Sequence, residues 1–72
     1  MSNGPHLPKD LADRPKLCRE LILARFDAGL STYDLARLTG IARSHIGHYE
    51  TGYLTPGPMR LAILRAALGI EK

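Results

Sequence analysis

Apolar residues recur at helical spacing in the first half of the chain. The first predicted helix covers residues 14–28, where Asp13 is placed to cap the first turn and Gly29 to end the last one. One stripe of this helix carries apolar side chains at intervals of three and four residues, namely Leu17, Leu21, Ala24 and Ala28. The stripe predicts an amphipathic helix that packs on a core.

A second helix is predicted over residues 32–39 by the residues at its two ends. Ser31 can cap the first turn, and Asp34, three residues later, completes a pair that satisfies two backbone N–H groups reciprocally. Gly40 follows the last turn and tolerates the left-handed backbone conformation that ends many helices. These signals predict a short helix with a sharp turn after it.

Two more helices are predicted over residues 43–51 and 58–68, and each is followed directly by a glycine. No stretch of the sequence alternates as a strand does, so the predicted fold class is all-α. Residues 1–13 contain two prolines, one glycine and little periodicity. We therefore expect a flexible N-terminal arm at residues 1–13 and a helical domain at residues 14–72.

The last predicted helix is apolar on two sides. One stripe is suited to the core of the domain and consists of Leu61, Leu64 and Leu68. The other stripe lies roughly opposite and consists of Met59, Ile63, Ala66 and Ile70. A helix that is apolar on both sides is usually covered on both sides, so we expect the second stripe to be a homodimer interface. The alternative is that the N-terminal arm covers it through Leu7 and Leu11.

The composition limits the classes of protein to which the chain can belong. A length of 72 residues with 44% hydrophobic residues suits one small domain with a modest core. The net charge of +3 is compatible with a nucleic-acid partner without requiring one. The single cysteine, Cys18, excludes an internal disulfide. No apolar run is long enough for a membrane span and no signal-peptide pattern is visible, so we expect a cytoplasmic protein.

The sequence contains no recognisable catalytic or metal-binding set of residues. Paired carboxylates, a nucleophile with its base and a phosphate-binding loop are all missing, and a small helical core offers little room for a pocket. We therefore expect no enzymatic activity and no cofactor. His45 and His48 are three residues apart without a third ligand nearby in the sequence, which argues against a metal site.

The helices predicted over residues 32–39 and 43–51 have the properties of a helix-turn-helix unit. Ala36 is small enough for a close crossing, and Gly40 permits the tight turn. The predicted inner side is apolar and consists of Leu35, Leu38, Ile41, Ile46 and Tyr49. The other side of the helix predicted over residues 43–51 is polar and consists of Arg43, Ser44, Gly47, His48 and Thr51. A recognition helix presents such a polar side to the major groove of DNA.

The segment around this unit resembles the Cro/C1-type (Xre-like) helix-turn-helix family of phage repressors and bacterial transcriptional regulators. The resemblance covers roughly residues 17–70 and rests on an ordered set of positions: Gly29-Leu30-Ser31, Leu35-Ala36, Gly40-Ile41, Ser44, Ile46, Glu50 and Gly52. It implies a compact lambda-repressor-like bundle of four helices with a central helix-turn-helix. Relatives commonly have a fifth helix, and the sequence reaches only to Lys72, so we expect the fifth family helix to be absent.

The resemblance implies that the predicted recognition helix reads base edges. The residues matching base-contacting positions are Arg43, Ser44 and His48. Arginine can bond O6 and N7 of guanine together, whereas for His48 a phosphate contact is the alternative. The residues expected to contact phosphates or to approach the DNA closely are Thr32, Ala42, His45, Gly47 and Thr51.

Two positions depart from the family pattern, and one pair follows it. The family usually has Gln in place of Thr32, and a capping Ser or Thr in place of Ala42. A missing cap costs about 0.5–2 kcal/mol, and a glycine in mid-helix such as Gly47 costs about 1 kcal/mol. Either Gly47 lets the helix backbone approach DNA closely, or the third helix is marginal until it binds. Arg25 and Glu50 match a pair that joins the first and third helices, so we expect a structural ion pair there.

Together these features predict a transcriptional regulator that binds double-stranded DNA in a sequence-specific way. Its simplest form is a repressor that occupies a palindromic operator as a homodimer through residues 43–51. The alternative is a protein-interaction module or an antitoxin-type partner-binding domain, which would use the apolar side of the last helix.

Overall fold

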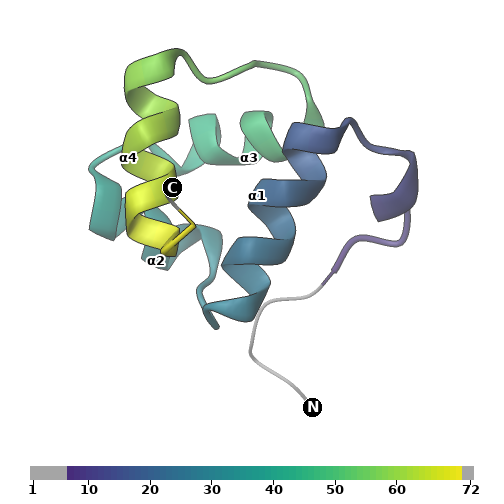
Figure 1. The fold of residues 1–72 in the computed structure, drawn as a ribbon, viewed down its shortest axis with the longest axis horizontal. Coiled ribbons are helices and arrows are strands. Elements are labelled where there is room, and N and C mark those ends of the chain that lie inside the picture. Colours follow the sequence, from purple (N-terminus) through teal and green to yellow (C-terminus); the bar gives the residue numbers. More distant parts are fainter. Residues whose placement is uncertain (1–6, 71–72) are drawn as a thin grey trace.

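A computed structural model describes residues 7–70, and in this range the chain contains only helices and loops (Figure 1). A short 3-10 turn, η1, precedes four α-helices: η1 (Leu11–Asp13), α1 (Lys16–Asp27), α2 (Thr32–Thr39), α3 (Arg43–Thr51) and α4 (Pro58–Leu68). The predicted all-α bundle of four helices is confirmed. The bounds of α2, α3 and α4 also agree with the sequence prediction.

The four helices surround one core, with α3 packed against both α1 and α2, and α2 packed against α4. The core contains buried side chains from every helix and from the turn after α2: Leu21, Leu35, Ile41, Ile46, Tyr49, Leu64 and Leu68. In Figure 1, α3 lies between α1 and α4. Its inner side is therefore fixed by tertiary packing.

The beginning of α1 differs from the sequence prediction. Residues 14–28 were expected to be helical, but α1 covers Lys16–Asp27, and Asp13 ends η1 instead of capping α1. Arg14 and Pro15 both have an extended backbone with ψ of 154°. The physical reason is that a proline ring disfavours helical backbone in the residue before it.

The buried stripe of α1 also differs from the prediction. Ala28 follows the helix as its C-cap and is exposed, so it does not belong to the core. Cys18 and Ile22 are buried, with 4% and 1% of their surface exposed, although the predicted stripe does not contain them. Because neighbouring helices cover more of α1 than one narrow stripe, its buried side is wider than the spacing alone suggests.

The ends of α2 form as predicted. The Ser31 hydroxyl accepts a hydrogen bond from the Asp34 backbone N–H at 3.0 Å, and the Asp34 carboxylate accepts one from the Ser31 N–H at 3.0 Å. The hydrogen bond from the Ser31 backbone N–H is the main reason that the pKa of Asp34 lies below its ordinary value of 3.8. Gly40 follows with φ of 75°, in the left-handed region.

One residue of α2 was assigned to the wrong side. Leu38 was expected on the apolar inner side of the helix-turn-helix, but 63% of its surface is exposed. It borders an open surface hollow together with Leu30, Asp34 and Arg37. The helix is only eight residues long, and α3 and α4 cover it on the side of Leu35, which leaves Leu38 uncovered.

The two sides of α4 are partly as predicted. The inward stripe holds, because Leu64 and Leu68 are buried and Leu61 packs against the core. On the other side Met59, Ile63 and Ala66 are exposed, with Met59 exposed to 78%. Ile70 was expected on this outer side, but it packs against the core because the chain turns after Leu68 through Gly69, whose φ is 74°.

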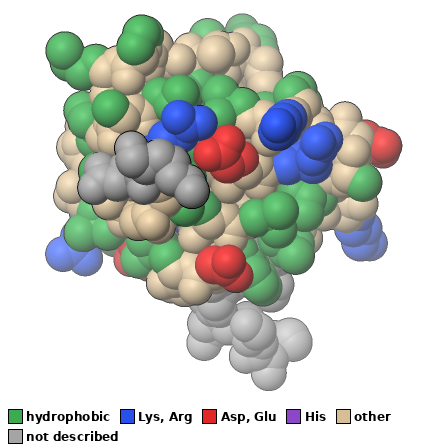
Figure 2. All heavy atoms as spheres, viewed as in Figure 1, with side chains coloured by type: hydrophobic (Ala, Val, Ile, Leu, Met, Phe, Trp, Pro, Cys, Tyr) green, Lys and Arg blue, Asp and Glu red, His purple; other side chains and the backbone are tan. Residues whose placement is uncertain are grey.

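The described part of the N-terminal arm lies away from α4. Residues 7–13 lie beside α1, on the side opposite to α4 (Figure 1). Leu7 is 42% exposed, and the segment of residues 7–13 does not cover α4 in Figure 1. The remaining residues of the predicted arm, 1–6, lie outside the described residues. On the molecular face in Figure 2, apolar and charged side chains are interspersed and no histidine is visible, so it is not the polar side of α3.

Candidate nucleic-acid interface

The third helix has one buried side and one exposed side. Ile46, Tyr49 and Glu50 are buried, with 1%, 5% and 7% of their surface exposed. Arg43, Ser44 and Thr51 are exposed, whereas His45, Gly47 and His48 are half-buried. The expected polar side of the helix therefore faces outward, although the two histidines are less accessible than the arginine.

The turn between α2 and α3 is held by side-chain hydrogen bonds. The Thr39 hydroxyl donates to the Leu35 carbonyl at 2.8 Å and accepts from the Ile41 N–H at 3.2 Å. Ile41 is buried, so the chain enters α3 from a fixed point. This arrangement fixes the angle at which α3 leaves the turn.

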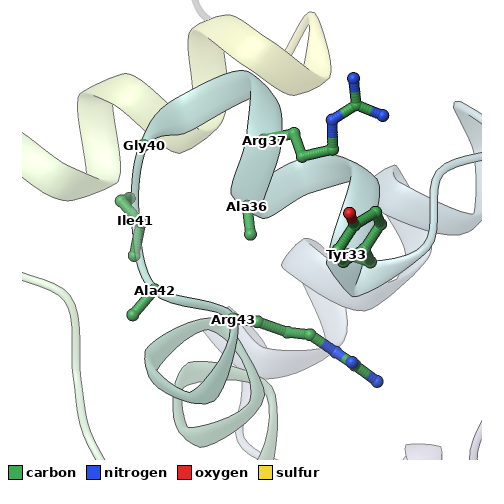
Figure 3. Close-up of a pocket in the computed structure, with 7 residues that line it drawn as sticks. All are labelled: Tyr33, Ala36, Arg37, Gly40, Ile41, Ala42 and Arg43. Carbon is green, nitrogen blue, oxygen red and sulfur yellow. The ribbon is translucent and has the colours of Figure 1, made fainter.

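An open groove runs between α2 and α3 (Figure 3). Its lining residues are Tyr33, Ala36, Arg37, Gly40, Ile41, Ala42 and Arg43. The side chains of Tyr33, Arg37 and Arg43 extend from one end of the groove (Figure 3), and the Arg37 guanidinium lies 5.9 Å from the centre of the Tyr33 ring. Two arginines and a tyrosine thus line the same groove, a combination suited to an anionic polymer.

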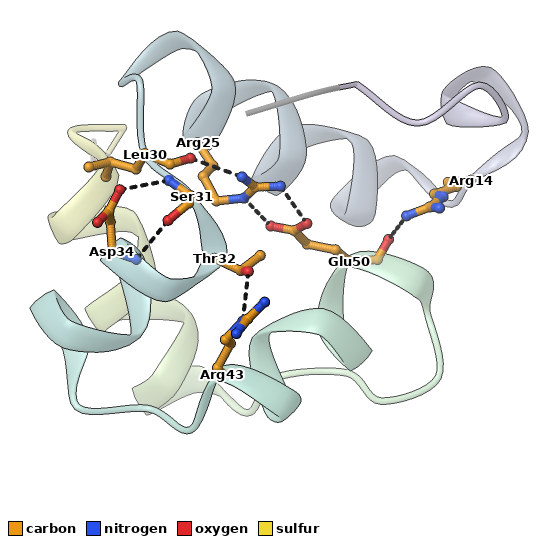
Figure 4. Close-up of polar contacts among 8 residues, drawn as sticks. All are labelled: Arg14, Arg25, Leu30, Ser31, Thr32, Asp34, Arg43 and Glu50. Atoms are coloured by element: carbon orange, nitrogen blue, oxygen red, sulfur yellow. Dashed lines mark hydrogen bonds and ion pairs between the residues drawn. The ribbon is translucent and has the colours of Figure 1, made fainter. Parts of the chain in front are cut away.

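The first residue of α3 contacts the first residue of α2. Arg43 Nε lies 3.4 Å from Thr32 Oγ1, so a predicted base-reading residue and a predicted phosphate-contacting residue are brought together (Figure 4). Thr32 is half-buried and Arg43 is exposed. The bond is long and on the surface, so it orients the guanidinium weakly and leaves its other N–H groups free to bind an acceptor.

His48 presents one ring nitrogen outward. Its Nδ1 is buried and has no hydrogen-bond partner among the described residues, and the His48 ring lies 4.8 Å from the ring of Tyr53. A proton on Nδ1 would be a buried donor without an acceptor among the described residues, which favours the tautomer with its proton on Nε2. His48 can then donate a hydrogen bond from the exposed side of the helix. Tyr53, in the loop after α3, was not expected at the site.

Two other predicted contact residues have partners within the chain. The Thr51 hydroxyl donates to the His48 carbonyl at 3.2 Å and accepts from the Tyr53 N–H at 3.4 Å, so it also closes the end of α3. His45 faces α4, where Arg60 Nη1 lies 3.3 Å from its Nδ1. Arg60 also donates to the Tyr49 hydroxyl at 2.9 Å, which ties α4 to α3.

Two positions of α3 leave its backbone accessible. Ala42 is exposed and provides no side-chain hydrogen bond to cap the helix. A Cβ atom added at Gly47 would meet nothing within 4 Å, so packing within this chain does not require glycine there. Both residues cost helix stability, and both lie where a ligand could approach the backbone closely.

The pair of Arg25 and Glu50 fastens α3 to α1. Arg25 Nε and Nη2 donate to the two carboxylate oxygens of Glu50 at 2.6 and 2.9 Å, and Arg25 Nη1 donates to the Leu30 carbonyl at 2.9 Å (Figure 4). Only 7% of each residue is exposed. A bidentate bond of this kind fixes orientation as well as distance.

Arg14 is a contact residue that the sequence did not indicate. Its Nη1 donates to the backbone carbonyl of Glu50 at 2.8 Å (Figure 4), although 36 positions separate the two residues. Its other contact is with Asp10, which lies in the predicted arm. No local pattern marks such a contact, because it depends on how the segment between η1 and α1 lies against the end of α3.

Within residues 7–70, no three acidic, histidine or cysteine side chains come together in a way that could hold a metal ion. In the same range, no helix is both long and apolar enough to cross a membrane.

Comparison with known proteins gives one match. The sequence model of a protein family described as helix-turn-helix matches residues 22–72, which include the end of α1 and all of α2, α3 and α4. No curated protein and no solved structure matches the chain. Residues 10–14 lie ahead of the matched segment.

Proposed function

The chain belongs to the Cro/C1-type helix-turn-helix family, a family of DNA-binding regulators, and from this membership we propose that it reads double-stranded DNA in a sequence-specific way. The observation that carries the proposal is the division of α3 into a buried side and a polar exposed side. The exposed side enters the major groove, while the buried side keeps the helix on the domain. The protein acts in the cytoplasm, where bacterial DNA lies.

The base-reading residues are Arg43, Ser44 and His48. Arg43 binds guanine through O6 and N7, and the loose contact with Thr32 keeps its guanidinium at the start of α3. His48 donates from Nε2 to an acceptor such as purine N7, which agrees with the burial of Nδ1. The exposed hydroxyl of Ser44 contacts either a base or a phosphate.

The DNA backbone is held by residues at the ends of the two helices. Thr32 at the start of α2 and Thr51 at the end of α3 contact phosphates, and His45 contacts the backbone beside Arg60. Ala42 and Gly47 allow the duplex to approach α3 closely, since neither has a side chain beyond Cβ. Arg37 adds positive charge at the groove between the helices.

The simplest regulatory form is a repressor that occupies a palindromic operator as a homodimer. The outer side of α4 supports a second copy of the chain, because Met59 and Ile63 are exposed to 78% and 39% and the described arm does not cover them. The dimer interface consists of Met59, Ile63 and Ala66, without Ile70. In such a dimer the two copies of α3 are spaced about 34 Å apart, one turn of DNA.

Selection of bound duplexes from a random library, with the full chain, tests sequence-specific binding. The proposal requires an enriched motif, and affinity for it falls with salt at a log–log slope of about −0.9 per phosphate contact. An absence of enrichment, or an affinity that does not change between low and physiological salt, contradicts it.

Sedimentation tests the dimer. The wild-type chain at micromolar concentration is expected to be a dimer, and Ile63→Asp a folded monomer that binds one half-site weakly. Leu23→Asp is the matched control, because Leu23 is a similarly exposed leucine on α1, with 43% of its surface exposed. A monomeric wild-type chain rejects the dimer.

The alternative function uses the same surface for a different partner. Met59 and Ile63 would then contact another protein, as in a protein-interaction module or an antitoxin-type domain. A chain that enriches no duplex and is monomeric favours this alternative. The chain would then not bind DNA, and the exposed apolar side of α4 would not be a dimer interface.

A further inference from the structure

Arg14 joins the N-terminal segment to the last turn of α3. Its guanidinium donates from Nη1 to the Glu50 carbonyl at 2.8 Å (Figure 4). It also donates from Nε to Asp10 Oδ1 at 3.2 Å. A second nitrogen, Nη2, lies 3.1 Å from the same Asp10 oxygen, and only 19% of the Arg14 side chain is exposed. The hydrogen bond from Arg14 also lowers the pKa of Asp10, because the bond favours the charged carboxylate. Asp10 thus holds Arg14 in the position from which it reaches α3.

The carbonyl that Arg14 binds belongs to the end of the helix. The last carbonyls of a helix have no partner within it and carry partial negative charge, so a cationic donor is favourable there. The His48 carbonyl accepts from the N–H groups of Gly52 and Leu54, both of which follow α3. The Glu50 carbonyl is instead bound by Arg14, which comes from before α1.

Glu50 is therefore held at two separate points. Arg25, from the last turn of α1, binds its carboxylate, and Arg14, from before the first turn of α1, binds its carbonyl. The buried side of α3 and the bond with Arg25 set the place of the helix in the fold. Arg14 adds a second bond on Glu50 from the opposite end of α1, and this bond restrains the last turn of α3 and so its direction.

We propose that Arg14, held by Asp10, is a positioning residue that sets the direction of α3 for DNA reading, so that the functional unit begins at Asp10, ahead of the segment that the family shares. This inference rests on the proposed function. Base readout requires side chains to be held within about 0.5 Å and 10–20° of the productive geometry. A small tilt of α3 therefore weakens contacts with bases, whereas phosphate contacts tolerate it.

The test uses the full chain with Arg14→Gln and measures affinity for the duplex selected by the wild type and for a scrambled duplex. The control is Arg65→Gln, which removes the same charge and breaks a partly exposed ion pair with Glu20, 3.3 Å long, between α4 and α1. Arg14→Gln is expected to lower the ratio of specific to scrambled affinity about tenfold, roughly the equivalent of one charge-assisted hydrogen bond. Arg65→Gln is expected to leave that ratio unchanged.

Two further variants separate positioning from charge. Arg14→Lys keeps the charge and one donor and is expected to recover part of the ratio. Asp10→Asn keeps Arg14 but removes the charge of its ion-pair partner. It is expected to lower the ratio of specific to scrambled affinity less than Arg14→Gln does. An equal loss of affinity on both duplexes for Arg14→Gln, or a ratio equal to that of Arg65→Gln, overturns the proposal.

A second measurement needs no DNA. In the free protein, Arg14→Gln is expected to speed amide hydrogen exchange at residues 48–54, around the end of α3, and to leave exchange of the α1 amides near Arg25 unchanged. Unchanged exchange at residues 48–54 overturns the proposal whether or not the chain binds DNA. If the wild type prefers no duplex while exchange changes as expected, the proposed function fails. The structural role of Arg14 at the end of α3 is then still supported.

Discussion

Helices α2 and α3 pack against each other, yet they are stabilised in different ways. In α2 the support is local, because Ser31 and Asp34 cap its first turn reciprocally and Gly40 ends it. In α3 the first turn has no side-chain cap at Ala42, and Gly47 lies in the middle of the helix. What holds α3 is tertiary, namely its buried side and the two arginines on Glu50.

The difference fits the proposed function. A side chain that fills the space beside Gly47 would lie on the polar side of α3 that is proposed to face DNA. The stability of α3 comes from its inner side and its last turn. The helix that supports the proposed reading surface follows the local rules of helix formation, and the helix that carries this surface departs from them.

The tertiary support of α3 is expected to give the largest effect when broken. Glu50→Ala leaves Arg25 buried without its partner and should destabilise the fold by about 3–5 kcal/mol in chemical denaturation. Glu20→Ala, which breaks the partly exposed pair with Arg65, should cost less than about 1 kcal/mol. Equal shifts for the two variants would mean that the Arg25–Glu50 pair does not fasten α3.

The caps provide the matched local test. Ser31→Ala removes the capping box of α2 and should destabilise the protein by about 1 kcal/mol. Ala42→Ser supplies the hydroxyl that α3 lacks and should stabilise it by up to about 1 kcal/mol, because Ala42 has a backbone that extends away from the helix, with ψ of 138°. Thermal unfolding of both variants decides, and the absence of any gain from Ala42→Ser would show that this turn cannot accept a cap.

A substitution at Gly47 is expected to change stability and DNA binding in opposite directions. Gly47→Ala should stabilise α3 by about 1 kcal/mol, since the added Cβ meets nothing in the chain. If the glycine serves close approach, the same variant binds the selected duplex more weakly although it unfolds at a higher temperature. Stronger binding together with higher stability would remove the functional reason for glycine.

The smallest effect concerns pH. The folded-state pKa of Asp34 lies below 3.8, so its contribution to stability is complete above about pH 4 and is lost as pH falls through the folded pKa. Unfolding measured from pH 7 to pH 3 should therefore show a steeper loss for wild type than for Asp34→Asn. Parallel curves would mean that the carboxylate contributes nothing to the cap.

The two helices also differ in how far the sequence predicts them. The bounds of α2 follow from Ser31, Asp34 and Gly40, which act within a few residues of one another. The outward side of α3 and the Arg25–Glu50 pair were expected from helical spacing and from the family resemblance. These local and family signals were sufficient because each of these residues lies in or beside a predicted helix. The helical spacing then shows which side of the helix each side chain occupies.

What the sequence missed depends on packing between distant segments. The exposure of Leu38 and the inward turn of Ile70 are decided by which neighbours cover each surface, and spacing alone does not give that. The contact of Arg14 with Glu50 needs the segment just before α1 to lie against the end of α3. Tyr53 reaches His48 only because the loop after α3 folds back through the Leu54 N–H, which donates to the His48 carbonyl at 3.2 Å.

We propose that the outer side of α3 reads DNA sequence while its inner side holds the fold, and the variant Arg43→Ala separates these two roles. Binding of wild type, Arg43→Ala and the control Arg37→Ala should be measured on the selected duplex and on duplexes with single base changes. Arg43→Ala is expected to lose about 1–3 kcal/mol of binding free energy and the preference at one base pair, with an unchanged unfolding temperature. A uniform loss on all duplexes, matching that of Arg37→Ala, would contradict the claim and assign Arg43 to the phosphate backbone.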